Sequence, residues 1–228
     1  YIQTFPQAGR ESRARLDRHQ IIVRKTNKPL DLDPLGEGWL LAKPIFISLT
    51  PLWWRDDRIE GVEVRALHDG NQIAILLSWK DATQDDSTVT PQSFSDGAAL
   101  QFSMEKDPPF FAMGGSDSPV SIWHWKASWQ KDLAGREDIE TAYPNTATDW
   151  YESQTNYEYG SPFETRDSKT QFHDPLFITG WSAGNPLSNP KRESSSEEAS
   201  AKGFGSLTTQ IPRVEKVNAK GIWQDGTW

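Results

Sequence analysis

The 228-residue chain has no cysteine. It therefore has no disulfides, no thiolates with which it alone could hold an iron–sulfur cluster, and no C-x-x-C-H motif for covalent haem attachment. Its four histidines are scattered along the sequence without the spacing of a zinc site. The sequence therefore excludes a disulfide framework and thioether-linked haem.

Long apolar runs and an excess of basic residues are also absent. No apolar segment approaches the roughly 18 to 20 residues that a membrane-spanning helix needs, and no apolar core of a signal peptide is present. The 32 acidic residues outnumber the 24 basic ones, which gives a net charge of −8. A nucleic-acid-binding surface would need the opposite balance. We predict neither a membrane span nor a nucleic-acid partner.

The motifs of common catalytic sites are missing as well. The sequence has no G-x-S-x-G nucleophile elbow, no P-loop and no dinucleotide-binding fingerprint. Adjacent acids such as Glu197 and Glu198 would point to opposite faces of a strand, so we interpret them as surface charge. We predict that the chain has no catalytic residues of its own.

Alternation of apolar and polar residues predicts β-strands. The clearest case is a hairpin in which residues 62–66 and 73–79 alternate on either side of a turn at 68–71. Further strands are predicted at residues 43–54, 100–104 and 120–125. Because turn signals recur at short intervals and no long amphipathic helix is evident, we predict an all-β fold, an antiparallel β-sandwich with long irregular loops.

Two regions lack this alternation. Residues 1–42 are predicted to form an extended N-terminal arm, and residues 43–228 a β-sandwich domain with a long polar insertion at about 130–200. Within the insertion, residues 190–200 are interpreted as an exposed linker or a short charged helix, and strand character returns from residue 203 onward. Long polar segments of this kind are often ordered by a partner, so we expect the arm and the insertion to dock against partner subunits.

One methionine occupies an unusual loop between the two strands at 100–104 and 120–125. Met113 follows Pro108 and Pro109, which stiffen the chain, and directly precedes Gly114, where the backbone can turn tightly. A thioether held at a loop tip suits an axial ligand of haem iron, and core filling is the alternative. Met104 continues the apolar face of its strand, so we predict that it packs in the core.

Eleven tryptophans are many for a chain of this length. Three interpretations remain open: platforms for sugar, walls for a large planar cofactor, and ordinary core packing. Trp123 and Trp125, in the strand after the methionine loop, are our candidate cofactor-binding tryptophans. A carbohydrate-binding β-sandwich module is therefore the alternative to a cofactor-binding protein.

Several short motifs together resemble one known family, the haem b-binding gamma subunits of ethylbenzene dehydrogenase, dimethylsulfide dehydrogenase, selenate and chlorate reductases and nitrite oxidoreductase. The shared order of motifs runs from about Asp57 to the end of the sequence. The matching segments are residues 96–102 (DGAALQF), Pro108-Pro109 with Met113-Gly114, 120–127 (VSIWHWKA), 183–186 (AGNP), 201–205 (AKGFG) and 221–228 (GIWQDGTW).

The resemblance implies an antiparallel sandwich holding one haem b, with Met113 as one axial ligand and a lysine as the other. Lys202 is the candidate lysine because it lies within the AKGFG motif, and an ordinary surface role is the alternative for it. A ligand beyond Trp228 is the open alternative, because similar proteins continue past this motif into a further strand. His124 is interpreted as a structural histidine, and Lys126 as a salt-bridging or haem-propionate-pairing residue, with a plain surface role as the alternative.

The resemblance also implies the partners. Members of the family work beside a molybdopterin catalytic subunit and an iron–sulfur subunit and exchange electrons with an external carrier, in the periplasm or an equivalent compartment. We therefore expect an electron-transfer subunit without a catalytic site.

Overall fold

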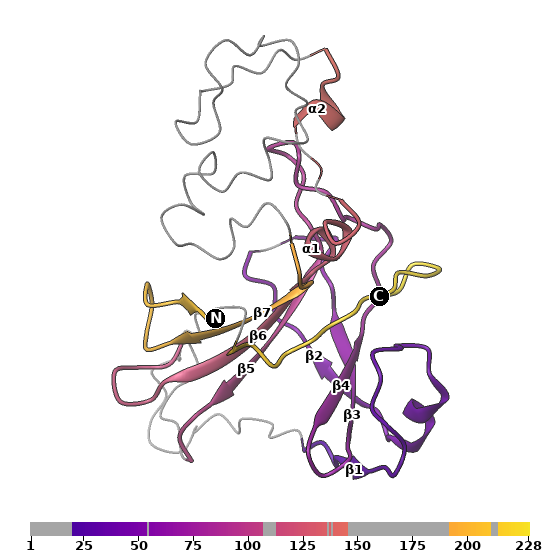
Figure 1. The fold of residues 1–228 in the computed structure, drawn as a ribbon, viewed down its shortest axis with the longest axis vertical. Coiled ribbons are helices and arrows are strands. Elements are labelled where there is room, and N and C mark those ends of the chain that lie inside the picture. The colour runs from indigo at the N-terminus through magenta and orange to yellow at the C-terminus, as the bar shows by residue number, and fades with distance from the viewer. Residues whose placement is uncertain are drawn as a thin grey trace, which may run out of the picture. The chain divides into compact units, whose positions relative to one another are not determined.

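The computed structural model describes residues 20–53, 55–106, 113–135, 137, 139–145, 192–210 and 214–228. It divides the chain into two compact units, each built on a four-stranded sheet (Figure 1). Helices in the described part are short, so the predicted all-β class is confirmed. Trp54, the residues 107–112 before Met113, most of the predicted insertion and the first 19 residues of the predicted arm lie outside the described residues.

The first unit comprises Tyr1–Gln84 and Lys220–Trp228. Its strands are β1 (Arg24–Lys25), β2 (Ile45–Ser48), β3 (Gly61–His68) and β4 (Ile73–Ser78), and a short 3-10 helix, η1, covers Glu37–Leu41. Strand β3 pairs antiparallel with β2 and β4 and parallel with β1. The predicted hairpin is therefore confirmed as β3–β4, and two residues of the predicted arm belong to this sheet.

Asp69 shapes the turn of that hairpin. Its carboxylate accepts hydrogen bonds from the backbone N–H groups of Asn71 and Gln72, both at 2.8 Å. These bonds lower the pKa of Asp69, and Gly70 beside it has a φ of 109°. The turn thus needs an aspartate, whose carboxylate accepts from the backbone, and a glycine, which adopts a positive φ without strain.

The end of the sequence closes the first unit. Trp228 is buried and exchanges two backbone hydrogen bonds with Trp79, at 3.0 and 3.1 Å, and the two rings stack with centroids 6.3 Å apart. The indole N–H of Trp223 donates to the carbonyl of Asp81 at 3.0 Å. These tryptophans therefore act as packing residues.

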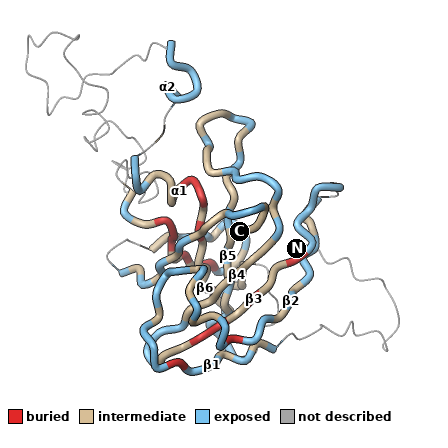
Figure 2. Tube along the Cα trace, turned by 90° about the vertical axis from the view of Figure 1, so that its right-hand side faces the viewer, coloured by how far each residue is buried: buried red, intermediate tan, exposed pale blue. Residues whose placement is uncertain are grey.

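The second unit, Asp85–Ala219, contains the sheet β5 (Gly97–Ser103), β6 (Val120–Lys126), β7 (Ser196–Ala201) and β8 (Thr208–Thr209) in that order. All of its neighbouring strands are antiparallel. The two strands predicted to flank Met113 are β5 and β6, and they pair along their whole length. Buried residues lie on β6, β7 and the start of the helix that follows β6, the last visible in Figure 2.

The interpretation of residues 190–200 as an exposed linker or charged helix is wrong. Residues 196–200 belong to β7, an inner strand between β6 and β8, and Ser196, Glu197 and Ala199 are buried. Burial is tolerated because each polar side chain has a partner. Ser195 and Ser196 donate to the carbonyls of Ala219 and Val217, while Glu197 accepts from other side chains described below.

The prediction that Met104 packs in the core is also wrong. Its side chain is 64% exposed. Strand β5 ends at Ser103, and the N–H of Met104 donates to the carbonyl of Pro119, where the hairpin opens. The alternation of β5 therefore no longer determines the direction of this side chain.

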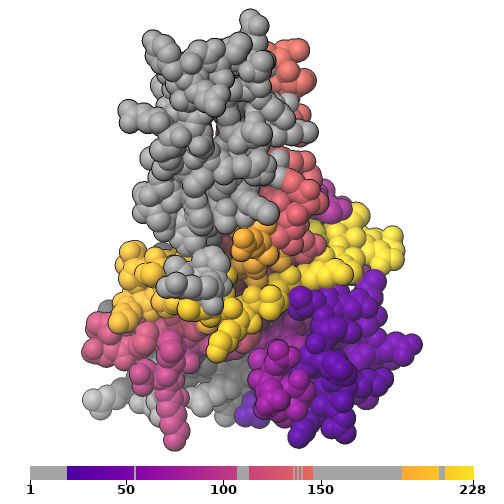
Figure 3. Space-filling view, in the orientation of Figure 1, coloured from indigo at the N-terminus to yellow at the C-terminus, as the bar shows by residue number. Residues whose placement is uncertain are grey.

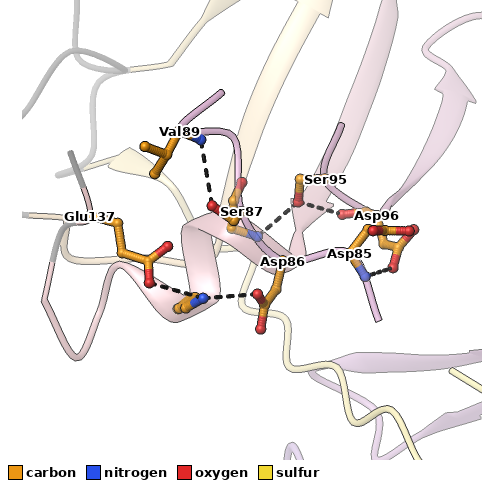
Figure 4. Close-up of polar contacts among 9 residues, drawn as sticks. Asp85, Asp86, Ser87, Val89, Ser95, Asp96 and Glu137 are labelled. Carbon is orange, nitrogen blue, oxygen red and sulfur yellow. Dashed lines mark hydrogen bonds and ion pairs between the residues drawn. The ribbon is translucent and has the colours of Figure 1, made fainter. Parts of the chain in front are cut away.

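A hydrogen-bonded network anchors helix α1 (Ala127–Lys131) to the segment before β5 (Figure 4). The Lys131 ammonium contacts Asp86 at 2.9 Å and Glu137 at 3.0 Å, and both carboxylates raise its pKa. The N–H of Ser128 donates to Ser95 Oγ at 2.8 Å.

A second short helix, α2, covers Ile139–Ala142. No helix in the described part of the chain is long and apolar enough to cross a membrane.

Candidate functional site

Two strand connections meet at one edge of the second sheet. Val120, the first residue of β6, pairs with Ser103 at the end of β5 and with Ala201 at the end of β7. In an antiparallel sheet this register brings the β5–β6 and β7–β8 connections to the same edge. Met113 lies in the first connection and Lys202 in the second.

A backbone hydrogen bond joins the two connections. The N–H of Gly203 donates to the carbonyl oxygen of Met113 at 2.7 Å. Figure 3 shows the surface of the β7–β8 connection, in orange, beside that of the β5–β6 connection, in pink. The structure thus brings two of the predicted site residues, Met113 and Lys202, onto adjoining backbone, although they are 89 positions apart in the sequence.

The backbone at Met113 is strained. Met113 has a φ of 53° and Gly114 a φ of 69°, and the left-handed region is unfavourable for a residue with a side chain. A Cβ atom at Gly114 would lie 2.5 Å from the carbonyl oxygen of Ser118 and 3.2 Å from that of Ala201. Gly115 and Ser118 then exchange two backbone hydrogen bonds that close the loop. The loop therefore holds Met113 in one tight conformation.

A serine closes the turn that carries Lys202. The N–H of Lys202 donates to Ser206 Oγ at 2.7 Å, and this hydroxyl donates to the carbonyl of Gly203 at 2.6 Å. Gly203 and Gly205 have φ values of 123° and 79°, and a Cβ atom at either would meet nothing within 4 Å. Lys202 itself is exposed. Ser206 was not among the predicted site residues, because its role depends on these two hydrogen bonds within the turn.

One face of the sheet leads away from these connections. By alternation, Val120, Ile122 and His124 share this face of β6, and their partners on β7 are Ala201, Ala199 and Glu197. Next to the connections this face therefore carries aliphatic side chains, and at its far end it carries polar ones. Ala199 and Ala201 are only 2% and 1% exposed.

Trp123 and Trp125 lie on the opposite face of β6. The ring of Trp123 packs on Phe102 with centroids 4.5 Å apart, and the buried Trp125 donates its indole N–H to Gln130 at 3.1 Å. Trp125 is also at the end of β6 remote from Met113. The described contacts thus bring together Met113 and Lys202 and do not join the two tryptophans to them.

At the polar end of the face, Glu197 binds two side chains. One carboxylate oxygen contacts His124 Nδ1 at 2.9 Å, and the other accepts from the Thr209 hydroxyl at 2.9 Å. Burial alone would raise the pKa of Glu197, but these hydrogen bonds and the charges of His124 and Lys126 outweigh it, so the pKa lies below the ordinary value of 4.5. His124 therefore has the partner expected of a structural histidine.

We expect Glu197→Gln to lower the free energy of unfolding at pH 7 by about 1 to 3 kcal/mol, the cost of a buried hydrogen-bonded charge lost from its partners. Because the pKa of the folded state is lowered, the ionised carboxylate stabilises the fold above about pH 4.5, and this contribution is lost as the pH falls through the folded pKa. Denaturant titrations of both proteins between pH 3 and 7 measure this. Glu193→Gln, at an exposed position, is the matched control. If the difference in unfolding free energy between the native chain and Glu197→Gln did not change with pH, the expectation would be wrong.

The two connections offer two potential metal donors, the thioether of Met113 and the primary amine of Lys202. Among the described residues, no group of three or more His, Cys, Asp or Glu side chains is placed to hold a metal ion. A soft sulfur donor does not suit Mg²⁺ or Ca²⁺. Sulfur and nitrogen donors do suit the two axial positions of an iron whose other ligands come from a porphyrin, so the residues fit a haem.

Fold and site together define a class: an all-β protein that presents its candidate ligands from strand connections at one edge of a sheet. The family model described as "Ethylbenzene dehydrogenase" matches residues 39–228. This chain therefore belongs to the ethylbenzene dehydrogenase family, and the resemblance found in the sequence motifs is confirmed.

Two curated relatives are similar over about half of this chain. A protein of Haloferax mediterranei named as a respiratory nitrate reductase heme subunit is 32% identical over 108 residues, covering 46% of this chain and 38% of the relative. The dimethylsulfide dehydrogenase subunit gamma of Rhodovulum sulfidophilum is 35% identical over 112 residues, covering 46% of this chain and 42% of the relative. The matches thus span about two fifths of the length of these relatives.

Proposed function

We propose that this chain is a haem b electron-transfer subunit in which Met113 and Lys202 are the axial ligands of the iron. The observation that carries the proposal is the 2.7 Å hydrogen bond from Gly203 to Met113, which holds the two connections together. Both side chains are long and unbranched and start from adjoining backbone. Family membership supports the proposal, as do the names of the two relatives, one a heme subunit and the other a gamma subunit.

Each residue has a distinct task in this proposal. The strained loop presents the Met113 thioether, which as a haem ligand favours reduced iron and a higher potential. Lys202 Nζ has to lose its proton before its lone pair can bind a metal. The Ser206 hydroxyl and the two glycines fix the Lys202 turn. The haem supplies a one-electron carrier, and the chain supplies ligands, orientation and a largely apolar surface.

The proposal includes a complex. The chain would relay electrons between an iron–sulfur subunit, which serves a molybdopterin catalytic subunit, and an external carrier. This would take place in the periplasm or an equivalent compartment. Catalysis would then reside in the partner, which agrees with the lack of a catalytic motif in this sequence.

The tryptophans favour this function over a carbohydrate-binding module. A sugar platform needs an exposed indole face. Of the described tryptophans, Trp53 alone is exposed, at 78%. Trp79, Trp123 and Trp228 use their rings for contacts inside the protein.

We expect the purified chain, supplied with haem, to bind one haem without covalent attachment, because the sequence has no cysteine for thioether bonds. Absorption spectra of the oxidised and reduced protein should show a six-coordinate low-spin haem. Acid–acetone extraction should move all of the pigment into the organic phase. A chain that binds no haem, or pigment that stays with the protein, would contradict the proposal.

A further inference from the structure

A phenylalanine is exposed at the tip of the turn that carries Lys202. The side chain of Phe204 is 80% exposed, although a phenylalanine ring is among the side chains that gain most when they leave water. Leu207, at the end of the same turn, is 54% exposed. Single apolar residues are normal on protein surfaces, and Phe204 is distinguished from them by the rigidity of its turn and by its neighbours.

The backbone on both sides of Phe204 is fixed by hydrogen bonds. The N–H of Ser206 donates to the carbonyl of Gly203 at 3.3 Å, so residues 203–206 form a β-turn. The third residue of this turn, Gly205, has a φ of 79°, as a type II turn requires. The Ser206 hydroxyl donates to the same Gly203 carbonyl at 2.6 Å. A ligand that contacts the Phe204 ring therefore loses little free energy to ordering the backbone beneath it.

The turn is joined to both proposed iron ligands. Gly203, next to Phe204, donates its N–H to the Met113 carbonyl at 2.7 Å. Lys202 lies two residues before Phe204 in the sequence, and its N–H donates to the hydroxyl that closes the turn. The aromatic ring thus starts from backbone that is bonded to the Met113 loop and continuous with Lys202.

The open space next to the two ligand residues lies at this turn. The sheet face beside the connections is closed, since Ala199 and Ala201 are only 2% and 1% exposed. In contrast, a Cβ atom built on Gly203 or on Gly205 would meet nothing within 4 Å. Space is therefore open on both flanks of Phe204, and this is where a flat ligand has room.

We propose that the Phe204 ring packs against the porphyrin of the haem, with Leu207 extending the apolar surface. This inference rests on the proposed function, which places the iron between Met113 and Lys202. A phenylalanine ring can stack on the face of another aromatic system or meet its edge, and either contact removes apolar surface of both partners from water. Phe204 is thereby a haem-contact residue that holds the porphyrin against the Lys202 turn.

Haem affinity and the stability of the haem-free chain test this together. In absorption titrations of the full chain, Phe204→Ala should weaken haem binding about tenfold, because apolar surface of the ring and the porphyrin returns to water. Its denaturation curve without haem should match that of the native chain, because the ring is already exposed there. Phe204→Tyr keeps the ring and should bind haem as the native chain does.

Phe94→Ala is the matched control. Phe94 is 79% exposed in the same unit, so the two positions differ little in residue type or exposure. It precedes Gly97, the first residue of β5, which lies at the end of the sheet opposite to Ser103 and the ligand connections. Haem affinity should not change in Phe94→Ala.

Nuclear magnetic resonance detects the contact directly. Reduced low-spin haem is diamagnetic, and its ring current shifts the resonances of side chains that pack on the porphyrin. In a full chain with labelled phenylalanine, the Phe204 resonances should move when reduced haem is bound, and those of Phe94 should stay in place. Spectra of Phe204→Ala and Phe94→Ala assign the two sets of signals.

The outcomes separate the two proposals. If the native chain binds no haem, the proposed function fails and this inference fails with it. If haem binds but the Phe204 resonances do not move, or if Phe204→Ala binds haem as tightly as the native chain, this inference fails and the haem assignment stands. A Phe204→Ala variant that keeps its haem affinity but loses self-association or binding to a partner subunit would also overturn it, because the ring would then belong to a protein interface.

Discussion

Replacing Met113 with leucine is expected to weaken haem binding by on the order of 100-fold and to abolish the low-spin spectrum. Even residues that only support metal ligands are worth about 10- to 100-fold in affinity, and this change removes a proposed ligand while keeping side-chain volume. The residual haem should have a lower reduction potential, since the thioether favours reduced iron. Spectroscopy and a redox titration of the variant measure both effects.

The second methionine is the control for this experiment. Met104 is 64% exposed and lies beyond the end of β5, so Met104→Leu should leave the spectrum unchanged and alter the free energy of unfolding by no more than about 0.5 kcal/mol. An unchanged low-spin spectrum in Met113→Leu would end the assignment of Met113. The same spectrum in Lys202→Gln would remove Lys202 as the second ligand.

Met113→Gly separates binding from folding. The native Met113 has a left-handed φ of 53°, which destabilises a residue with a side chain by about 1 kcal/mol. Glycine adopts this conformation without that strain. The variant without haem should therefore be as stable as the native chain or more stable, although it cannot bind haem through sulfur. A clear loss of stability would show that the methionine is held for core packing, the alternative that the sequence left open.

The second large effect is expected at Gly114. Alanine there should destabilise the loop by about 1 to 3 kcal/mol, because φ is 69° and the new Cβ would lie 2.5 Å from the Ser118 carbonyl oxygen. The backbone has to move, and Met113 next to it moves too. We therefore expect haem binding to weaken together with the stability.

A single amide reports this displacement. The Gly203 N–H donates to the Met113 carbonyl, so its hydrogen exchange should accelerate in Gly114→Ala if the loop shifts. Gly115→Ala is the control, since a Cβ atom there meets nothing within 4 Å. Equal exchange at Gly203 in both variants would mean that the loop tolerates a side chain at Gly114.

Local patterns predicted the hairpins well. In the β3–β4 hairpin, period-two alternation and the Asp69-Gly70 turn both point to the same structure, and the observed register agrees. The strands around Met113 were predictable for the same reason, as β5 and β6 pair from Gly97 to Ser103. These elements are determined by neighbours in the sequence.

Strand β7 could not be predicted in this way. Its sequence is polar, and its partners come from elsewhere: Glu197 needs His124 on β6 and Thr209 on β8, while Ser196 needs the carbonyl of Val217. A buried strand stabilised by distant hydrogen bonds has no apolar alternation to detect. Met104 shows the reverse error: alternation predicts that it continues the apolar face of β5, but the strand ends at Ser103 and Met104 is exposed.

The site was predictable in composition and not in arrangement. Met113 stood out because of the proline and glycine residues around it, and Lys202 through the resemblance of its motif. The hydrogen bond between their connections depends on how β6 pairs with β7, and that pairing was not predicted.

The pairing of Trp79 with Trp228 has a consequence for synthesis on the ribosome. The two residues are 149 positions apart, and all of the second unit lies between them in the sequence. Residues 20–84 therefore emerge first but have to wait for Trp228 before their last backbone hydrogen bonds form, whereas the second unit emerges with its own strands complete. Closing a loop of this length costs entropy and slows folding. We expect the nascent first unit to stay open, and exposed to chaperones and proteases, until translation reaches Trp228.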